Sequence, residues 1–193
     1  MKYKLAVEPI LFSLGLITLA SLIYVMGTSM LFVFSIGNIE STYLLALLLF
    51  MPIGFIVLPL LLAKRQFSEM KISDVQWDWR QYISLAFLIF LLNHFFIHSD
   101  EYFHQMVISI CEEVLFRYII YRLIRENYNY VMAILISAVL FGFVLHLNYP
   151  VYDNLFIRTP LGILFSIFAT KIGLHYAVAG HWIYNLVVSR IPF

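Results

Sequence analysis

Long apolar runs separated by short polar connections make up almost the whole chain. About 20 apolar residues span the hydrocarbon core of a bilayer, so each run is a candidate membrane helix. The pattern predicts an all-α fold, a polytopic transmembrane helical bundle of about seven membrane helices. The expected helices cover 5–26, 42–63, 82–97, 105–123, 130–147, 160–170 and 173–189.

Three stretches need a closer look. The sixth run, 160–170, is short, and we expect it to be partly re-entrant. The run SMLFVFSIG, 29–37, either lies in the membrane interface or extends the first helix. The first run looks like a signal peptide, but Glu8 and Pro9 interrupt its start and no small-x-small cleavage site follows. We therefore expect it to be a retained membrane helix.

Composition agrees with a membrane protein. Hydrophobic residues make up 63% and charged residues 12% of the chain, whereas soluble domains are about one quarter charged. Seven crossings use nearly all 193 residues, so we expect a single membrane domain, 1–193. The net charge is +1 and no basic face is interleaved with exposed aromatics, so the bilayer is an expected partner and nucleic acid is not. The single cysteine, Cys111, excludes an internal disulfide.

The basic residues of the connections predict the orientation. They cluster in every second connection, while 27–41, 98–104 and 148–153 contain no lysine or arginine. Basic connections stay on the cytoplasmic side, so we expect a cytoplasmic N-terminus. The fourth helix then runs from outside to inside, with Glu112 about seven residues, or roughly 10 Å, below its outer end. The basic residues are Lys2, Lys4, Lys64, Arg65, Lys71, Arg80, Arg122 and Arg125.

Two adjacent glutamates interrupt the fourth apolar run, SICEEVLFRYIIYRL. Ionisable residues are costly in a bilayer and usually face the bundle interior or a water-filled cavity. Glu113 and Arg117 are spaced i, i+4, which predicts an ion pair on one helical face. Glu112 is rotated about 100° from Glu113 and remains without this partner. A structural role and a functional role are both open for Glu113, whereas a functional role is favoured for Glu112.

Two later helices supply partners at a similar depth. His146 ends the fifth predicted helix, and His181 and Asn185 lie one turn apart on one face of the seventh. A carboxylate in a poorly solvated site can act as a general base toward water, and imidazole and carboxamide groups can stabilise an oxyanion. A cavity formed by these side chains would be suited to peptide hydrolysis. The remaining histidines are expected at the membrane interface: His94, His98, His104 and His175.

These residues resemble the motifs of a known family. EEVLFR matches EExxxR and HWIYN matches HxxxN of the CAAX-protease and bacteriocin-processing (CPBP, or Abi) family of intramembrane glutamic proteases. His146 lies where the family's FxxxH motif belongs, although Gly142 takes the aromatic position, between Phe141 and Phe143. The resemblance covers a catalytic core of about 105–189 and leaves 1–104 as N-terminal helices.

The resemblance implies a division of roles. Glu112 would activate water with help from His146, His181 and Asn185 would form the oxyanion site, and Glu113 and Arg117 would hold Glu112 in place. No cofactor is required in this scheme. Zinc held by Glu112, His146 and His181 is the less favoured alternative, because three such ligands could leave an open position but HExxH is absent. Cys111 is not expected to be the nucleophile.

The function expected from the sequence is an intramembrane endopeptidase of a bacterial cytoplasmic membrane, with its active site toward the outer face. Its substrate would be a membrane-associated or exported protein or peptide, such as a C-terminal sorting segment. A prenylated CAAX protein is the alternative substrate. Members of the family are also linked to bacteriocin immunity, so a non-enzymatic peptide-binding protein is a second reading. A transporter is a third, disfavoured because paired broken helices are missing.

Overall fold

The computed structural model describes residues 7–34, 38–67, 74–147 and 149–191. The described parts of the chain form seven continuous helical segments and contain no strand. Five of the segments include a short stretch of π-helix, in which hydrogen bonds close from residue i to i+5. The predicted all-α bundle is confirmed.

Three segments make up the N-terminal part of the fold. The first is α1, Val7–Phe34, and the second joins α2, η1 and α3, which cover Ile39–Met51, Pro52–Val57 and Leu58–Gln66. The third joins α4, Trp79–Leu92, to η2, Asn93–Ile97.

Four segments make up the C-terminal part of the fold. The fourth joins α5, η3 and α6, which cover Tyr102–Glu113, Val114–Ile120 and Tyr121–Arg125. The fifth joins α7 and η4, and the sixth joins α8, η5 and α9. The seventh is α10. These elements cover Tyr130–Val139, Leu140–Leu145, Val151–Asp153, Asn154–Arg158, Thr159–Lys171 and Leu174–Val188.

Five segments are longer than the sequence pattern predicts, and two of them, the first and the sixth, concern stretches that the sequence left open. Residues 29–34 of the SMLFVFSIG run continue α1 to Phe34, while 35–37 lie outside the described residues. The sixth segment is helical from Val151 to Lys171, so it starts nine residues before the predicted helix. The prediction started this helix at Pro160. Proline has no N–H to donate, but it costs little in the first turn of α9, where the π-helix η5 changes to α-helix.

Three of the segments are long and apolar enough to cross a membrane, namely Val7–Phe34, Ile39–Gln66 and Trp79–Ile97, and Tyr130–Leu145 is a shorter apolar helix. The fourth segment has suitable length but carries the buried charged residues. Three of the basic residues behind the predicted orientation, Lys2, Lys4 and Lys71, lie outside the described residues.

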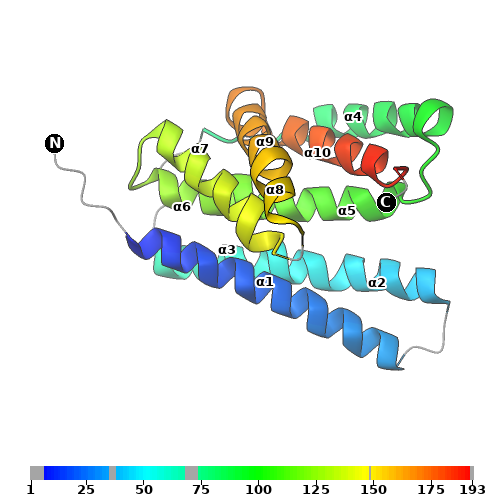
Figure 1. The fold of residues 1–193 in the computed structure, drawn as a ribbon, viewed down its shortest axis with the longest axis horizontal. Coiled ribbons are helices and arrows are strands. Elements are labelled where there is room, and N and C mark those ends of the chain that lie inside the picture. Colours follow the sequence, from blue (N-terminus) through cyan, green and yellow to red (C-terminus); the bar gives the residue numbers. More distant parts are fainter. Residues whose placement is uncertain (1–6, 35–37, 68–73, 148, 192–193) are drawn as a thin grey trace.

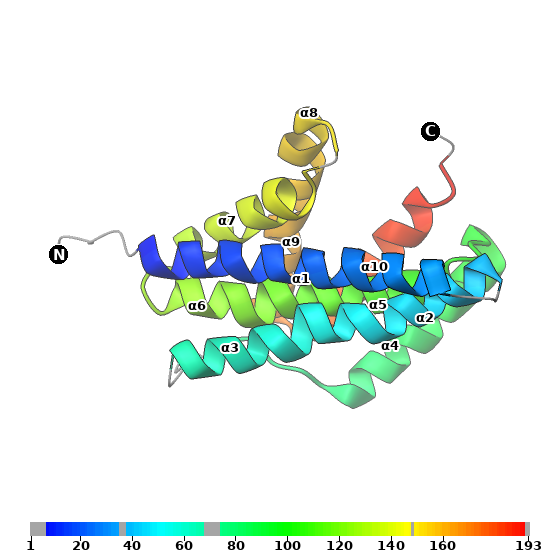
Figure 2. The same ribbon diagram turned by 90° about the horizontal axis from the view of Figure 1, so that it is seen from below.

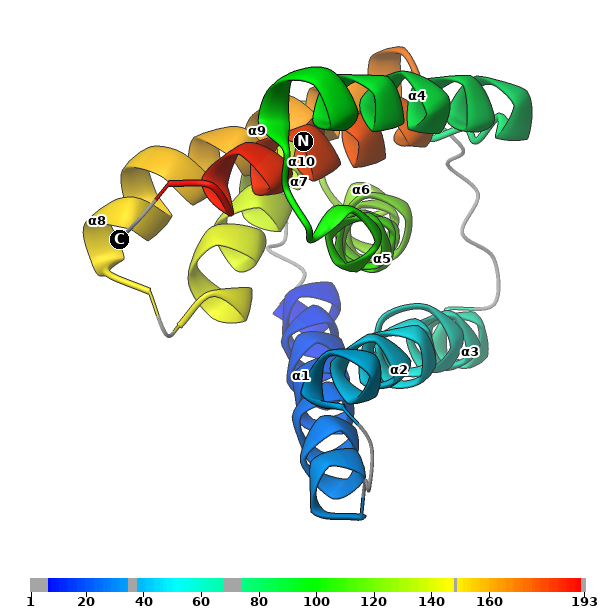
Figure 3. The same ribbon diagram turned by 90° about the vertical axis from the view of Figure 1, so that its right-hand side faces the viewer.

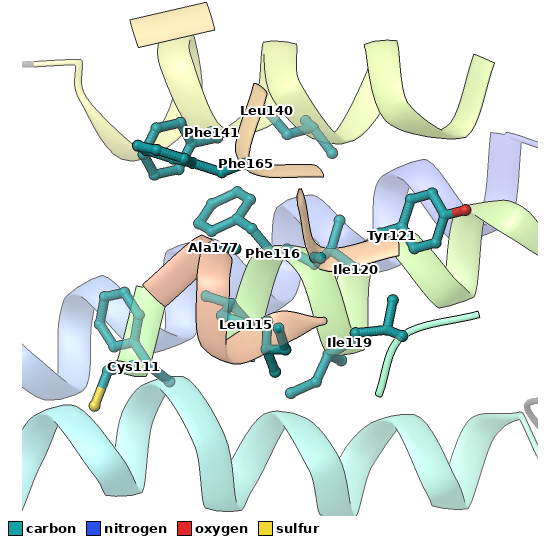
Figure 4. Close-up of a cluster of buried hydrophobic side chains, with 14 of the residues drawn as sticks. Cys111, Leu115, Phe116, Ile119, Ile120, Tyr121, Leu140, Phe141, Phe165 and Ala177 are labelled. Atoms are coloured by element: carbon teal, nitrogen blue, oxygen red, sulfur yellow. The ribbon is translucent and has the colours of Figure 1, made fainter. Parts of the chain in front are cut away.

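The α5–α6 segment is the central helix of the bundle. It runs beside α1 (Figure 1), and when viewed along its length it lies between the α1–α3 layer and the layer of α4, α9 and α10 (Figure 3). The α8–α9 segment rises steeply across this direction (Figure 2). Between Cys111 and Ile124 every residue of the central helix is buried except Val114 and Tyr118, as expected for a helix with packed neighbours on every side. Its fully buried side chains include Leu115, Phe116, Ile119, Ile120 and Tyr121 (Figure 4).

A close approach between the fifth and sixth segments fixes the end of the fifth. Gly142 in η4 lies against the backbone of η5 and the start of α9, where an added Cβ would be 3.1 Å from the Asn154 carbonyl oxygen and would collide with the Thr159 hydroxyl. The Asn154 side chain then donates a hydrogen bond of 2.9 Å to the carbonyl oxygen of His146. These contacts position the last turn of the fifth segment, which carries His146.

We predict that Gly142→Ala lowers the thermal midpoint of the protein in detergent, because the added methyl group forces η4 away from η5. Overpacking of this kind costs about 1–3 kcal/mol. Gly15→Ala is the matched control, since a Cβ at Gly15 meets no atom within 4 Å and alanine is the better helix former. Equal or higher stability of Gly142→Ala relative to Gly15→Ala would contradict the close packing described here.

Candidate active site

Four predicted site residues line one cavity of about 650 Å³. Glu112 comes from α5, His146 follows η4, and His181 and Asn185 come from α10. Glu112 and His181 are buried, and His146 and Asn185 are half-buried. The structure thus brings together side chains that are up to 73 residues apart in the sequence, the separation of Glu112 and Asn185.

The depth of Glu112 differs slightly from the expectation. Its helix begins at Tyr102 rather than near 105, so Glu112 lies about ten residues, or roughly 15 Å, from that end. This places the carboxylate near the middle of the fourth segment, just on the side of its first half.

Glu113 and Arg117 form the ion pair that their spacing predicts. The Arg117 Nε donates to Glu113 Oε2 at 3.0 Å, and both side chains are at most 1% exposed. The remaining guanidinium nitrogens have no hydrogen-bond partner among the described residues, but the group lies 4.8 Å from the centre of the Phe141 ring. An aromatic face attracts a cation at this distance, so Phe141 compensates part of the buried charge.

The sequence reasoning missed a second partner of Glu113. Its Oε1 lies 2.9 Å from His181 Nδ1, so the one carboxylate joins Arg117 on its own helix to a histidine on α10. A carboxylate in an ion pair only accepts hydrogen bonds, which assigns a proton to Nδ1 of His181. The other ring nitrogen, Nε2, faces Glu112 Oε2 at 3.8 Å. The i, i+4 spacing could reveal the pair within a helix but gave no signal for the contact between helices.

His146 is oriented by the main chain. Its Nδ1 is 2.8 Å from the carbonyl oxygen of Phe141. A carbonyl oxygen only accepts, so Nδ1 carries the proton and, in the neutral ring, Nε2 is a free acceptor. His146 is therefore suited to receive a proton in the cavity that it lines with Glu112.

Phe141 supplies the aromatic contact that the FxxxH spacing left unassigned. Its ring packs edge-on against His146 at 4.9 Å and against His181 at 5.7 Å between ring centres. Phe141 is five residues before His146 because the intervening η4 is π-helical, and a π turn accommodates one extra residue. Gly142, four residues before His146, packs against Thr159 instead. The π-helix thus explains the departure from the motif.

Two of the histidines expected at the membrane interface are buried by neighbouring segments. His104 is stacked on Tyr43 with ring centres 5.3 Å apart. His175 accepts from the Asp78 backbone N–H at 3.3 Å and lies 2.8 Å from Gln81 Oε1, so it joins the start of α10 to the start of α4. Both lie in the first turn of their helices. Cys111 packs in the apolar core and does not line the cavity.

The zinc alternative concerns Glu112, His146 and His181. Within the described residues, no group of three or more His, Cys, Asp or Glu side chains that could hold a metal ion is found. His181 Nδ1 contacts Glu113, and its Nε2 is 3.8 Å from Glu112 Oε2.

Glu112, His146, His181 and Asn185 thus bring a carboxylate, two imidazoles and an amide to one cavity of the bundle. A family model described as type II CAAX prenyl endopeptidase Rce1-like matches residues 102–187, the segment that carries all three motifs. This match confirms the predicted resemblance: residues 102–187 are similar to the type II CAAX prenyl endopeptidases of the CPBP family. No curated protein and no solved structure matches the chain.

We predict that Arg117→Ala destabilises the fold, because it leaves Glu113 as a buried, uncompensated charge. Breaking one partner of a buried pair costs about 3–5 kcal/mol. Unfolding in detergent, followed by heat or denaturant, measures the loss. The same change at the exposed Arg65 serves as the control and should leave the midpoint unchanged. A midpoint equally unaffected by Arg117→Ala would show that the pair contributes nothing to stability.

Proposed function

We propose that the protein hydrolyses a peptide bond of a membrane-associated or exported protein, with a water activated by Glu112. The observation that carries the proposal is the meeting of Glu112, His146 and His181 in one cavity within the bundle. The family match supports an endopeptidase, and the cavity supports Glu112 as the residue that activates water.

The proposed reaction begins with a water molecule bound between Glu112 and His146. Glu112 Oε2 takes a proton as the water oxygen attacks the substrate carbonyl, and His146 Nε2 holds the water through its second proton. The same carboxyl group then protonates the leaving amine as the C–N bond breaks. Glu112 therefore acts first as a carboxylate base and then as a carboxylic acid, and the cycle needs no second base.

Asn185 and His181 are the proposed oxyanion partners. Asn185 can donate through its amide nitrogen as negative charge develops on the carbonyl oxygen. His181 can donate through Nε2 only when the ring carries both protons, because Nδ1–H is already given to Glu113. The carboxylates of Glu112 and Glu113, 3.8 and 2.9 Å from the ring nitrogens, supply the negative charge that balances an imidazolium. In this proposal Glu113 is a positioning residue for His181.

Catalysis without a metal ion is part of the proposal. A carboxylate can act as a general base toward water unaided, so Glu112 needs no metal ion for this role.

The charge pattern of the connections supports a site in the outer half of the membrane. With a cytoplasmic N-terminus, the fourth helix runs inward, and the cavity lies in the half where the fourth helix starts and the fifth ends. This placement favours an exported or membrane-anchored substrate, such as a C-terminal sorting segment. The family description names a prenylated CAAX substrate, which would be presented from the cytoplasm, so orientation separates the two candidates.

We predict that Glu112→Gln, His146→Ala and His181→Ala each lower peptide hydrolysis by at least about 100-fold while the protein stays folded. The assay uses the purified protein in lipid nanodiscs with a pooled library of quenched fluorescent peptides. Glu40→Gln and His94→Ala are matched controls, since both residues are exposed and neither lines the cavity. Full turnover by Glu112→Gln would remove the proposed base. A peptide-binding immunity protein would keep its biological effect in that variant.

The orientation predicts which engineered cysteines react in intact cells. In a Cys111→Ala background, cysteines at Asp100 and Tyr152, both exposed, should react with a membrane-impermeant maleimide. A cysteine at Arg65, on the opposite side, should react only after permeabilisation. The reverse labelling pattern would move the site to the cytoplasmic half and make the prenylated substrate the better candidate.

A further inference from the structure

Arg158 is the one lysine or arginine among the described residues that line the cavity. It ends η5, in the stretch that the sequence pattern left outside the sixth helix. It lines the same cavity as Glu112 and His146. None of the six predicted site residues accounts for a cation at this place.

The guanidinium of Arg158 is held in a defined position. Its Cζ lies 3.6 Å from the centre of the Tyr149 ring, which also lines the cavity. At this distance the planar group lies against the aromatic face, so its N–H edge remains available for hydrogen bonds in its own plane. A fixed guanidinium loses little freedom when it binds an anion with two parallel bonds.

Arg158 lacks the anionic partner that comparable arginines have. Arg117 pairs with Glu113 at 3.0 Å and Arg125 approaches Asp74 at 3.9 Å. For Arg158, no carboxylate of the described residues lies within ion-pair distance, and its buried Nε has no hydrogen-bond partner there. A half-buried cation without an anionic partner in a membrane bundle is costly, and such residues commonly mark a substrate path.

We propose that Arg158 binds a carboxylate of the substrate within a few residues of the scissile bond and thereby sets the cleavage position. The inference rests on the proposed function and adds a requirement on the substrate. A cavity of about 650 Å³ accommodates a short extended segment, and each residue of such a segment advances about 3.3 Å. A carboxylate on Arg158 and a carbonyl beside Glu112 must therefore be close in the substrate sequence.

Two substrate groups carry this chemistry, the C-terminal carboxylate and an aspartate or glutamate side chain. Both present the planar pair of oxygens that a guanidinium binds through two bonds. Peptides that the wild-type protein cleaves in the pooled library provide the starting probe. Each is resynthesised as a free acid and as a C-terminal amide, and with each nearby acidic residue changed to its amide.

The test compares KM and kcat for these matched peptides. We expect the peptide that lacks the critical carboxylate to show a KM at least 10-fold higher with wild-type protein and little change in kcat. Arg158→Gln should show the same rise with the acid and no further rise with the amide. Arg158→Lys should recover part of the difference, because it restores charge without the planar pair of donors. Arg65→Gln, far from the cavity, should behave as wild type.

Several results would overturn the proposal. One is an unchanged KM for Arg158→Gln, and another is an Arg158→Gln protein that still distinguishes acid from amide. A third is a dependence on Arg158 that follows the content of phosphatidylglycerol in the nanodisc and not the peptide carboxylate, since the bound anion would then be a lipid phosphate. If Arg158→Gln fails to fold, Tyr149→Leu can be used, because it removes the ring on which Arg158 stacks. It should reduce the difference in KM between the acid and amide peptides.

Failure of the proposed function is distinguishable from failure of this inference. Binding of the labelled acid and amide peptides to the Glu112→Gln protein, measured by fluorescence anisotropy, needs no hydrolysis. Tighter binding of the acid that disappears in Glu112→Gln/Arg158→Gln supports the carboxylate site even if the protein cuts nothing. Equal binding of acid and amide to Glu112→Gln overturns the site even if Glu112 proves catalytic.

Discussion

The structure depends on one buried carboxylate that serves two helices. Glu113 accepts from Arg117 within the fourth segment and from His181 on α10, at 3.0 and 2.9 Å. Charged groups inside a membrane bundle need partners that compensate their charge, and here those partners also join two helices. Because the bond to His181 assigns the proton of that ring, the contact that stabilises the bundle also determines which nitrogen faces Glu112.

Much of the architecture follows from hydrophobic runs and helical spacing alone. The seven runs predict the seven segments, and the i, i+4 relation of Glu113 and Arg117 predicts their pair. The same geometry leaves Glu112 free for the cavity. The contact of Glu113 with His181 could not be predicted in this way, because it depends on the rotation of α10 against α5, which apolar periodicity does not determine.

The π-helical stretches account for most of what the sequence concealed. The turn before His146 places Phe141, rather than residue 142, against the two histidines. The π-helical stretch that ends at Arg158 belongs to the sixth segment, which starts before Pro160, the predicted start. Arg158, which precedes that predicted start, therefore lines the cavity. A π turn could not be predicted from the local residue pattern, because packing with neighbouring helices stabilises its extra residue.

The two histidines of the cavity are held by different kinds of group. The ring of His146 is oriented by a main-chain carbonyl, whereas that of His181 is oriented by the Glu113 side chain and stacked on Phe165 at 5.2 Å. A main-chain acceptor is present whichever side chain the residue bears. The orientation of His146 therefore tolerates replacement of its neighbours as long as the turn keeps its shape, while that of His181 is vulnerable to a single substitution on another helix.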